Sequence, residues 1–336
     1  MRILFYDVAT PLNYTDKTLK ERALGGTEAT LIRIAHALSH SHTIYVAQHC
    51  RTLKEDIESN GVHYVSFPTA HEINPDVVIL LRQHSFLEHT AKKFPHSKLF
   101  FWMHNSPPSD FFYSHSTLEK YHYHIIAVSN FHRELIENRL KGKWYQRIFT
   151  SPKKNIPVSV IYNPIEDDLF PNQSVVKSNQ LIFASSPQKG LKETLKLFSA
   201  VLKKFPEYEL LIANPGHREM QIELPRQVKL LGALPHHQVI QKIRESFCVF
   251  YPQTQKIETF GLVYAEANAV GTPVLAHDLG AAKEVLSDPS QLVDGNNINS
   301  IIKKLSEWRK KRPVFAGKNE FRLKKVATKW LDVFNS

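Results

Sequence analysis

The sequence predicts an α/β protein with two parallel β-sheets. Short apolar runs alternate with helical patterns along the chain, which is typical of strands joined by crossover helices. The apolar runs form two series, and polar segments over residues 163–168 and 172–179 separate them as a linker. A chain of 336 residues is long enough for two ordinary domains. We therefore expect two doubly wound domains.

The strands follow from short apolar runs, and the helices follow from apolar residues that recur on one helix face. The clearest helical pattern runs from Leu31 to Leu38, and a last helix is expected over Asn319–Asn335. The strands expected in the first sheet are Ile3–Val8, Thr43–Val46, Val62–Phe67, Val77–Leu81, Leu99–Met103 and Ile125–Val128. Those expected in the second sheet are Leu181–Ala184, Leu210–Ala213, Val228–Leu231, Val249–Tyr251 and Val274–Ala276.

Composition narrows the class of protein. The net charge of +11 and the pI near 9.4 favour an acidic partner such as nucleic acid, anionic lipid or a phosphorylated substrate. No apolar run approaches the ~18 residues of a spanning helix, and Asp7 interrupts the first apolar run too early for a secretory signal. The two cysteines, Cys50 and Cys248, form no disulfide framework. We therefore expect a cytoplasmic protein.

The most informative segment runs from Ile257 to Val274. It predicts a loop carrying Glu258, an apolar helix beginning near Gly261, and a tight turn into a buried strand. A carboxylate at Glu266, inside that helix, is costly to bury unless a partner compensates its charge. Glu258 lies just before the helix, where free backbone N–H groups collect anions. Two acids beside such a helix end suit a ligand with hydroxyls and phosphates, as in a nucleotide sugar.

Each acid taken alone also has a purely structural explanation, because a carboxylate near a helix N-terminus stabilises the helix dipole. The combination is more specific. From Glu258 to Val274 the sequence reads Glu-x-Phe-Gly-x-x-x-x-Glu and then Ala-x-Gly-x-Pro-Val. This pattern resembles the signature of the retaining GT-B-fold glycosyltransferases of the family-four type, also called glycosyl transferases group 1.

The resemblance implies a GT-B fold, in which two Rossmann-like doubly wound domains face a central cleft. Residues 1–165 would form the acceptor-side domain, and residues 178–318 would form the domain that binds the nucleotide sugar. A C-terminal helix over residues 319–336 would pack back on the first domain. Ligands of such folds bind at the carboxyl ends of the strands.

The resemblance also implies roles for particular residues. Glu258 would hydrogen-bond the donor sugar, and Glu266 would hydrogen-bond the ribose. Lys189 and the backbone amides of Gly261 and Leu262 would offset charge on the leaving pyrophosphate. The catalytic set is then His104, Glu258 and Lys189, and the donor-binding set is Gly25, Gly26, Ser185, Ser186, Lys189, Asn214, Glu258, Phe260, Gly261, Leu262 and Glu266.

Two loops contain residue types that are suited to bind the phosphates of a nucleotide sugar. Gly25 and Gly26 precede a helix, so the backbone can approach a ligand closely there, although a plain turn explains them equally well. The loop that carries Lys189 follows a strand and precedes a helix, which is a phosphate-binding context. Here Ser185 and Ser186 stand where the family commonly has a Gly-Arg pair, so a serine hydroxyl would replace the arginine.

His104 is singled out among 18 histidines by its position at the end of an apolar strand. A histidine there matches the family histidine near the transferred sugar. Asn214 ends another strand in the second half of the chain, in a region that lies near the nucleotide in the family.

Absent motifs bear on metals and cofactors. No Asp-x-Asp occurs, so a metal-bridged donor site is not supported, and no metal or cofactor is expected. No Gly-x-Gly-x-x-Gly follows the first strand, which disfavours a dinucleotide oxidoreductase.

Basic residues gather in two segments with interleaved aromatic residues. One runs from Lys303 to Lys329, and the other covers residues 141–147 and 153–154. Such segments are either solvated charged faces that keep a protein soluble or surfaces that bind anionic membranes. Nucleic acid is the third candidate partner, but no recognised nucleic-acid-binding module accompanies the charge, so we expect none to bind.

The resemblance implies a retaining hexosyl-type glycosyltransferase, and the absence of Asp-x-Asp favours one that needs no metal. Its donor would be a UDP- or GDP-sugar, and its acceptor a glycan or lipid-linked sugar in bacterial cell-surface polysaccharide or lipopolysaccharide synthesis. The protein would be located in the cytoplasm, with peripheral association at the inner face of the cytoplasmic membrane. The alternatives are an epimerase or phosphorylase of the same fold, or a basic protein that binds nucleic acid.

Overall fold

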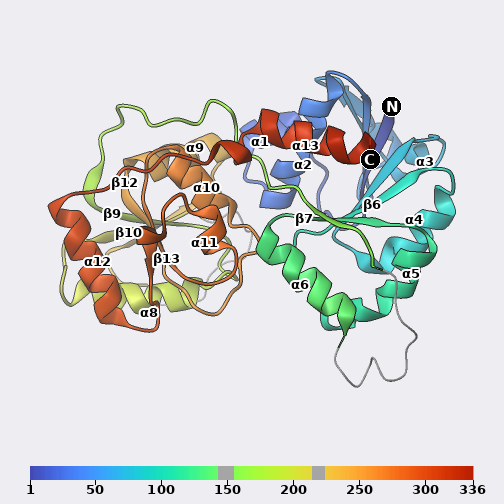
Figure 1. The fold of residues 1–336 in the computed structure, drawn as a ribbon. Helices are drawn as coiled ribbons and strands as arrows, with labels where there is room; N and C mark the ends of the chain where they lie inside the picture. Colours follow the sequence, from blue (N-terminus) through green and yellow to red (C-terminus); the bar gives the residue numbers. More distant parts are fainter. Residues whose placement is uncertain (143–154, 214–223, 336) are drawn as a thin grey trace. The chain divides into compact units, whose positions relative to one another are not determined.

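The computed structural model describes residues 1–142, 155–213 and 224–335, which form two compact α/β units (Figure 1). Unit 1 comprises Met1–Asp16, Thr27–Pro164 and Leu323–Ser336, and unit 2 comprises Lys17–Gly26 and Ile165–Arg322. Each unit has its own predominantly parallel sheet, so the expected fold class, with two Rossmann-like domains, is confirmed.

Unit 1 is built on an eight-stranded sheet with the order β3-β4-β2-β1-β5-β6-β7-β8. All neighbours are parallel except β3 and β4, which form an antiparallel pair at one edge. The chain moves from β1 toward one edge and then restarts at β5 toward the other. The strands are β1 (Arg2–Asp7), β2 (Thr43–Gln48), β3 (Ile57–Ser59), β4 (Val62–Val65), β5 (Val77–Leu81), β6 (Lys98–Trp102), β7 (His124–Ala127) and β8 (Val158–Val160).

Alternation along these strands sends successive side chains into two different cores. On one face, Tyr6 of β1 packs edge-on against Phe94. On the other face, Phe5 packs against Trp102 of β6 and against Trp330 of α13 (Leu323–Asn335). The other helices of this part of the chain are α2 (Gly26–Ser39), α3 (Phe67–Ala70), α4 (Leu87–Lys93), α5 (His115–Lys120) and α6 (Asn130–Lys141), with 3-10 turns η1 (Leu53–Glu55), η2 (His84–Phe86) and η3 (Ser109–Ser114).

Unit 2 is built on a six-stranded parallel sheet with the order β11-β10-β9-β12-β13-β14. The strands are β9 (Lys177–Ala184), β10 (Glu209–Ala213), β11 (Val228–Gly232), β12 (Ser246–Tyr251), β13 (Val274–His277) and β14 (Leu292–Val293). The helices are α1 (Asp16–Glu21), α8 (Leu191–Leu202), α9 (His236–Glu245), α10 (Leu262–Ala269), α11 (Ala282–Val285) and α12 (Ile298–Lys310), with 3-10 turns η4 (Pro289–Gln291) and η5 (Asn319–Phe321).

All eleven strands expected from the apolar runs are present, with ends shifted by a few residues. The sequence analysis missed β3, β8 and β14, each of which has three residues or fewer. The expected linker through residue 179 was too long, because β9 begins at Lys177 and pairs there with Ser246 of β12. The first four residues of β9 are polar, so a pattern based on apolar runs showed only its second half.

In the part of the chain that the structure describes, no helix combines the length and apolar character needed to cross a membrane.

Candidate functional site

The chain order of the unit 2 strands reverses between β9 and β12. The chain builds β9, β10 and β11 toward one edge, and then returns to place β12 on the other side of β9. At such a switch point the loops that leave the two strands diverge, and ligands of open α/β sheets bind in the crevice between them. Lys189 follows β9, and Glu258 follows β12. The topology therefore brings together two residues that lie 69 positions apart in the sequence.

Lys189 and Glu258 form an ion pair at this point. Lys189 Nζ donates to Glu258 Oε2 over 2.8 Å. The lysine side chain is 50% exposed, whereas the glutamate side chain is only 7% exposed. Because an ammonium group has three donors, Lys189 can also reach an anion in solvent while it holds Glu258. The pair thus joins a buried acceptor to a cation that remains accessible.

Tyr251, the last residue of β12, contacts the second carboxylate oxygen of Glu258. Its hydroxyl lies 2.8 Å from Glu258 Oε1 and 2.9 Å from the backbone carbonyl of Lys189. Burial, together with the nearby Glu258 charge, raises the pKa of Tyr251, so the hydroxyl stays protonated and can donate. Both carboxylate oxygens of Glu258 therefore have a donor, which offsets the cost of burying the charge.

The loop that carries Glu258 is held by a close backbone approach. The amide of Ala281 donates to the Glu258 carbonyl over 2.9 Å. Gly280, with φ +68°, lies so near that a Cβ atom on it would meet that carbonyl oxygen at 2.5 Å. No side chain larger than hydrogen fits without moving the loop.

Helix α10 begins directly after this loop. Gly261 precedes it with φ +86° and ψ +63°, a left-handed conformation that favours glycine. The first amides of α10, including that of Leu262, have no carbonyl one turn earlier in the helix, and free amides at a helix N-terminus are suited to bind an anion. Phe260 is buried and packs edge-on against Phe321, so its side chain serves to anchor the loop.

Glu266 lies inside α10 and is compensated by His236, the first residue of α9. His236 Nε2 and Glu266 Oε1 are 2.7 Å apart, and the glutamate side chain is 7% exposed. The sequence analysis required a partner for Glu266 but did not find His236. The two residues are 30 positions apart, and a histidine after a turn carries no pattern that distinguishes it from the other histidines.

The structure describes most of the remaining residues that the sequence analysis expected in the donor site. Ser185 and Ser186 follow β9, and the Ser186 carbonyl accepts the amide of Lys189 over 2.9 Å, which forms a turn under the lysine. Gly25 and Gly26 belong to unit 2, and a Cβ atom on Gly26 would lie 3.9 Å from the Leu262 side chain at the start of α10. Asn214 lies outside the described residues.

Unit 1 has a buried ionic cluster at its own switch point, between β1 and β5. Arg82, directly after β5, donates to Asp7 Oδ1 at the end of β1 and to Glu28 Oε1 of α2, both over 2.8 Å. Tyr14 donates to the other Asp7 oxygen over 2.8 Å. Although burial opposes the charge on Arg82, Asp7 and Glu28 raise the pKa of its guanidinium. The sequence analysis did not identify this cluster.

His104 lies two residues beyond β6 in unit 1, at the strand end where the sequence placed it. It is buried, and its ring lies 4.4 Å from the Trp102 ring, measured between centroids. Burial, with added repulsion from Arg82 and His132, lowers the pKa of His104 well below the ordinary histidine value. His104 is therefore a neutral imidazole at physiological pH.

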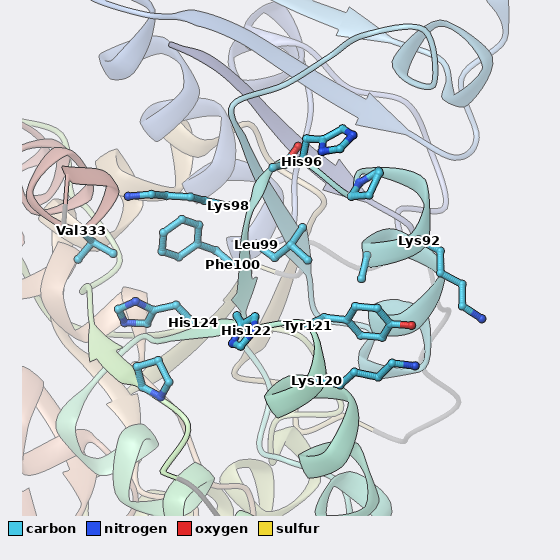
Figure 2. Close-up of a pocket in the computed structure, with 14 residues that line it drawn as sticks. Lys92, His96, Lys98, Leu99, Phe100, Lys120, Tyr121, His122, His124 and Val333 are labelled. Atoms are coloured by element: carbon cyan, nitrogen blue, oxygen red, sulfur yellow. The ribbon is translucent and has the colours of Figure 1, made fainter.

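Unit 1 also has a hollow of about 920 Å³ at the amino ends of β6 and β7, lined by several lysines and histidines (Figure 2). The lysines that line this hollow are engaged in contacts within unit 1 or lie at helix ends. Lys98 Nζ donates over 3.1 Å to a carbonyl in the last turn of α13, and Lys92 pairs with Glu88 at 2.9 Å. Lys92 and Lys120 lie in the last turns of α4 and α5, where a cation stabilises the helix dipole. Figure 2 shows Lys98 directed toward α13 and Lys92 and Lys120 on the opposite side, so the ammonium groups do not converge on a ligand.

The basic segment from Lys303 to Lys329 differs from its expected form. Its interleaved Trp308 and Phe321 are buried, as is Trp330 that follows it, so these rings cannot enter a membrane. Arg312 and Arg322 donate hydrogen bonds to backbone carbonyls instead of facing solvent. Most of the second expected segment, residues 143–147 and 153–154, lies outside the described residues.

Known proteins resemble the chain in both sequence and fold. Residues 165–330, which cover most of unit 2 and the first part of α13, match the family model of glycosyl transferases group 1. A GDP-mannose-dependent monoacylated alpha-(1-6)-phosphatidylinositol monomannoside mannosyltransferase of Corynebacterium glutamicum is 28% identical over 132 residues, or 36% of this chain and 35% of that protein. A phosphatidyl-myo-inositol mannosyltransferase of Mycolicibacterium smegmatis is 32% identical over 106 residues, or 30% and 27% of the two chains. These matches span about a third of the relatives' lengths.

Solved structures match over nearly the whole chain. A glycosyltransferase from Rickettsia africae has a TM-score of 0.68 at 16% identity, covering 99% of this chain and 97% of that one. An alpha,alpha-trehalose-phosphate synthase from Burkholderia xenovorans has a TM-score of 0.66 at 9% identity, covering 99% of both. Residues 165–330 thus resemble the glycosyl transferases group 1 family, and the chain has the GT-B fold.

Proposed function

We propose that the protein is a retaining, metal-independent hexosyltransferase that takes its sugar from a UDP- or GDP-sugar. The observation that carries this proposal is the Lys189–Glu258 pair beside the amino end of α10, at the switch point of unit 2. A cation, helix amides and a buried carboxylate there supply what a diphosphate with an attached sugar needs. The family match to unit 2 supports the same assignment.

Each group has a separate role in the proposed reaction. Lys189 and the amides of Gly261 and Leu262 stabilise the charge that develops on the leaving diphosphate. Glu258 accepts hydrogen bonds from the sugar hydroxyls, and Glu266 accepts them from the ribose. His104, as a neutral imidazole, contacts the transferred sugar. The described chain places no carboxylate that we assign as a covalent nucleophile, so we propose that the acceptor attacks on the face that the diphosphate leaves.

The acceptor that we propose is a sugar or a lipid-linked glycan, in the synthesis of a bacterial cell-surface polysaccharide or glycolipid. The lipid-containing acceptors in the names of the two mannosyltransferases support a lipid-linked acceptor. The exposed lysines of the segment from Lys303 to Lys329 would then favour peripheral binding at the cytoplasmic face of an anionic membrane. Because the name of the first relative includes GDP-mannose, we propose GDP-mannose as the first donor to test.

The direct test measures binding and slow hydrolysis of a panel of UDP- and GDP-sugars by thermal shift, calorimetry and product analysis. We expect one nucleotide class to bind, with slow release of the free sugar when no acceptor is present.

Glu266→Gln should weaken donor binding by roughly 1–3 kcal/mol, because an amide oxygen accepts a hydroxyl hydrogen less strongly than a carboxylate. Unchanged donor affinity in the folded variant would return Glu266 to a structural role. An epimerised sugar or a sugar phosphate as product would identify one of the non-transferase alternatives.

A further inference from the structure

The contact between His236 and Glu266 joins two helices of unit 2 at a carboxylate. Glu266 is almost fully buried, and its Oε1 lies 2.7 Å from His236 Nε2. An ionised carboxylate can only accept hydrogen bonds, so Nε2 carries the hydrogen in this contact. The short distance is typical of a hydrogen bond to a charged acceptor. The imidazole therefore restricts rotation of the Glu266 carboxylate about its last side-chain bond.

The backbone that carries the imidazole is anchored through α9. Pro235 precedes the helix with φ −55° and ψ +149°, which sets the direction in which the chain enters α9. Ile240 and Ile243 are buried and anchor the same helix in the core. The core thus anchors the helix from which His236 reaches Glu266.

We propose that His236 is a positioning residue of the donor subsite, which orients the Glu266 carboxylate toward the ribose hydroxyls of the nucleotide. This inference rests on the proposed function, in which Glu266 binds the ribose. Each carboxylate oxygen has two lone pairs, so the bond from His236 leaves acceptor capacity for the ribose diol. When His236 is removed, the carboxylate loses both its orientation and one of the donors that compensate its buried charge.

The test measures how strongly the protein distinguishes ribose from 2′-deoxyribose. Dissociation constants for UDP, GDP and their 2′-deoxy forms are measured by calorimetry, and the ratio of deoxy to ribo values is compared among variants. In the wild type we expect the deoxy form of the preferred nucleotide to bind on the order of tenfold more weakly, as for loss of a hydrogen bond to a charged group. In His236→Phe this ratio should fall several-fold toward one. His236→Gln, which keeps a donor, should restore much of it.

Three controls separate positioning from general damage. His237→Phe alters the next residue of the same helix, which is exposed, and should keep the wild-type ratio. Glu266→Gln should lose most of the discrimination, and adding His236→Phe to it should cause little further loss. If His236→Phe does not fold, His236→Ala is measured in its place.

The outcomes distinguish the inference from the function on which it rests. Equal weakening of ribo and deoxy nucleotides in His236→Phe, or no change in either, would show that the histidine is only structural. Donor hydrolysis by a wild type with no ribose preference would overturn the inference and leave the function standing. A wild type that binds neither UDP nor GDP would overturn both.

Discussion

Replacement of Gly261 by alanine should destabilise unit 2 by two separable effects. The first is backbone strain, since φ at Gly261 is +86° and an L-residue there costs about 1–2 kcal/mol. The second is steric overlap, because the new Cβ atom would lie 2.5 Å from Cδ2 and 2.7 Å from Cε2 of the buried Tyr264 ring. Overpacking of this kind costs about 1–3 kcal/mol. The expected total loss is roughly 2–5 kcal/mol.

Gly232 provides a matched control for the strain alone. Its φ is +70°, and a Cβ atom added to it would meet no atom of the described residues within 4 Å. Gly232→Ala should therefore lose only about 1–2 kcal/mol. The difference between the two variants then isolates the overlap with Tyr264, about 1–3 kcal/mol.

The assay is urea unfolding read by hydrogen exchange of peptides from unit 2, because the two units need not unfold together. Nucleotide binding is measured in parallel. The Tyr264 ring packs edge-on against Tyr251, whose hydroxyl contacts Glu258, so a displaced ring should also weaken donor binding in Gly261→Ala. Equal losses of stability in Gly261→Ala and Gly232→Ala would refute the predicted overlap with Tyr264 and leave backbone strain as the only cause of the loss.

Three further outcomes are expected. Donor hydrolysis should survive EDTA, since the described residues contain no group of three potential metal ligands and the sequence has no Asp-x-Asp; complete loss that Mg²⁺ or Mn²⁺ restores would contradict this. The contribution of His132 to the stability of unit 1 should be full above about pH 6.5 and fall by up to roughly 3 kcal/mol toward pH 4, because burial lowers the pKa of His132 to about 4 and only the unfolded chain protonates this residue in that range. Denaturant midpoints across pH should show a smaller fall in His132→Gln, and an equal fall would show that other groups cause it. Replacement of the exposed Lys310, Lys311, Lys324 and Lys325 by glutamine should reduce salt-sensitive co-sedimentation with acidic vesicles, and a wild type that does not sediment at low salt would exclude membrane binding through these charges.

The sequence was sufficient for features that depend on local pattern. Runs such as Val77–Leu81 are apolar throughout because both faces of a central parallel strand are buried, so the strand is visible without knowledge of its neighbours. The sequence likewise indicated that Glu266 needs a partner, because it carries a charge into an apolar helix. Burial of its side chain and its contact with His236 bear out that part of the reasoning.

The partners themselves could not be predicted from pattern. Tyr251 ends an apolar strand and looks like one more core residue until its hydroxyl is found 2.8 Å from Glu258. Arg82 contacts Asp7 only because β1 and β5 are neighbours in the sheet, although 75 residues separate the pair. Contacts of this kind depend on strand order, which composition and periodicity do not specify.

Strand pairing also explains why β3, β8 and β14 were missed. Each is too short to show a period of its own, and each exists because a longer neighbour offers backbone hydrogen bonds at the edge of a sheet. Edge strands of this length are products of tertiary structure more than of local preference.

The placement of α13 has a consequence for how the chain is made in the cell. Unit 2 is a continuous insertion between Pro164 and Leu323, apart from the short segment 17–26, and its two ends are joined where the Ile165 amide donates to the Phe321 carbonyl over 2.8 Å. Trp330 of α13 fills the unit 1 core against Phe5. On the ribosome, the strands of unit 1 must therefore wait, with an apolar face exposed, until unit 2 and then residues 323–335 have been made. The part of the chain that is synthesised first thus depends for its core on the part that is synthesised last.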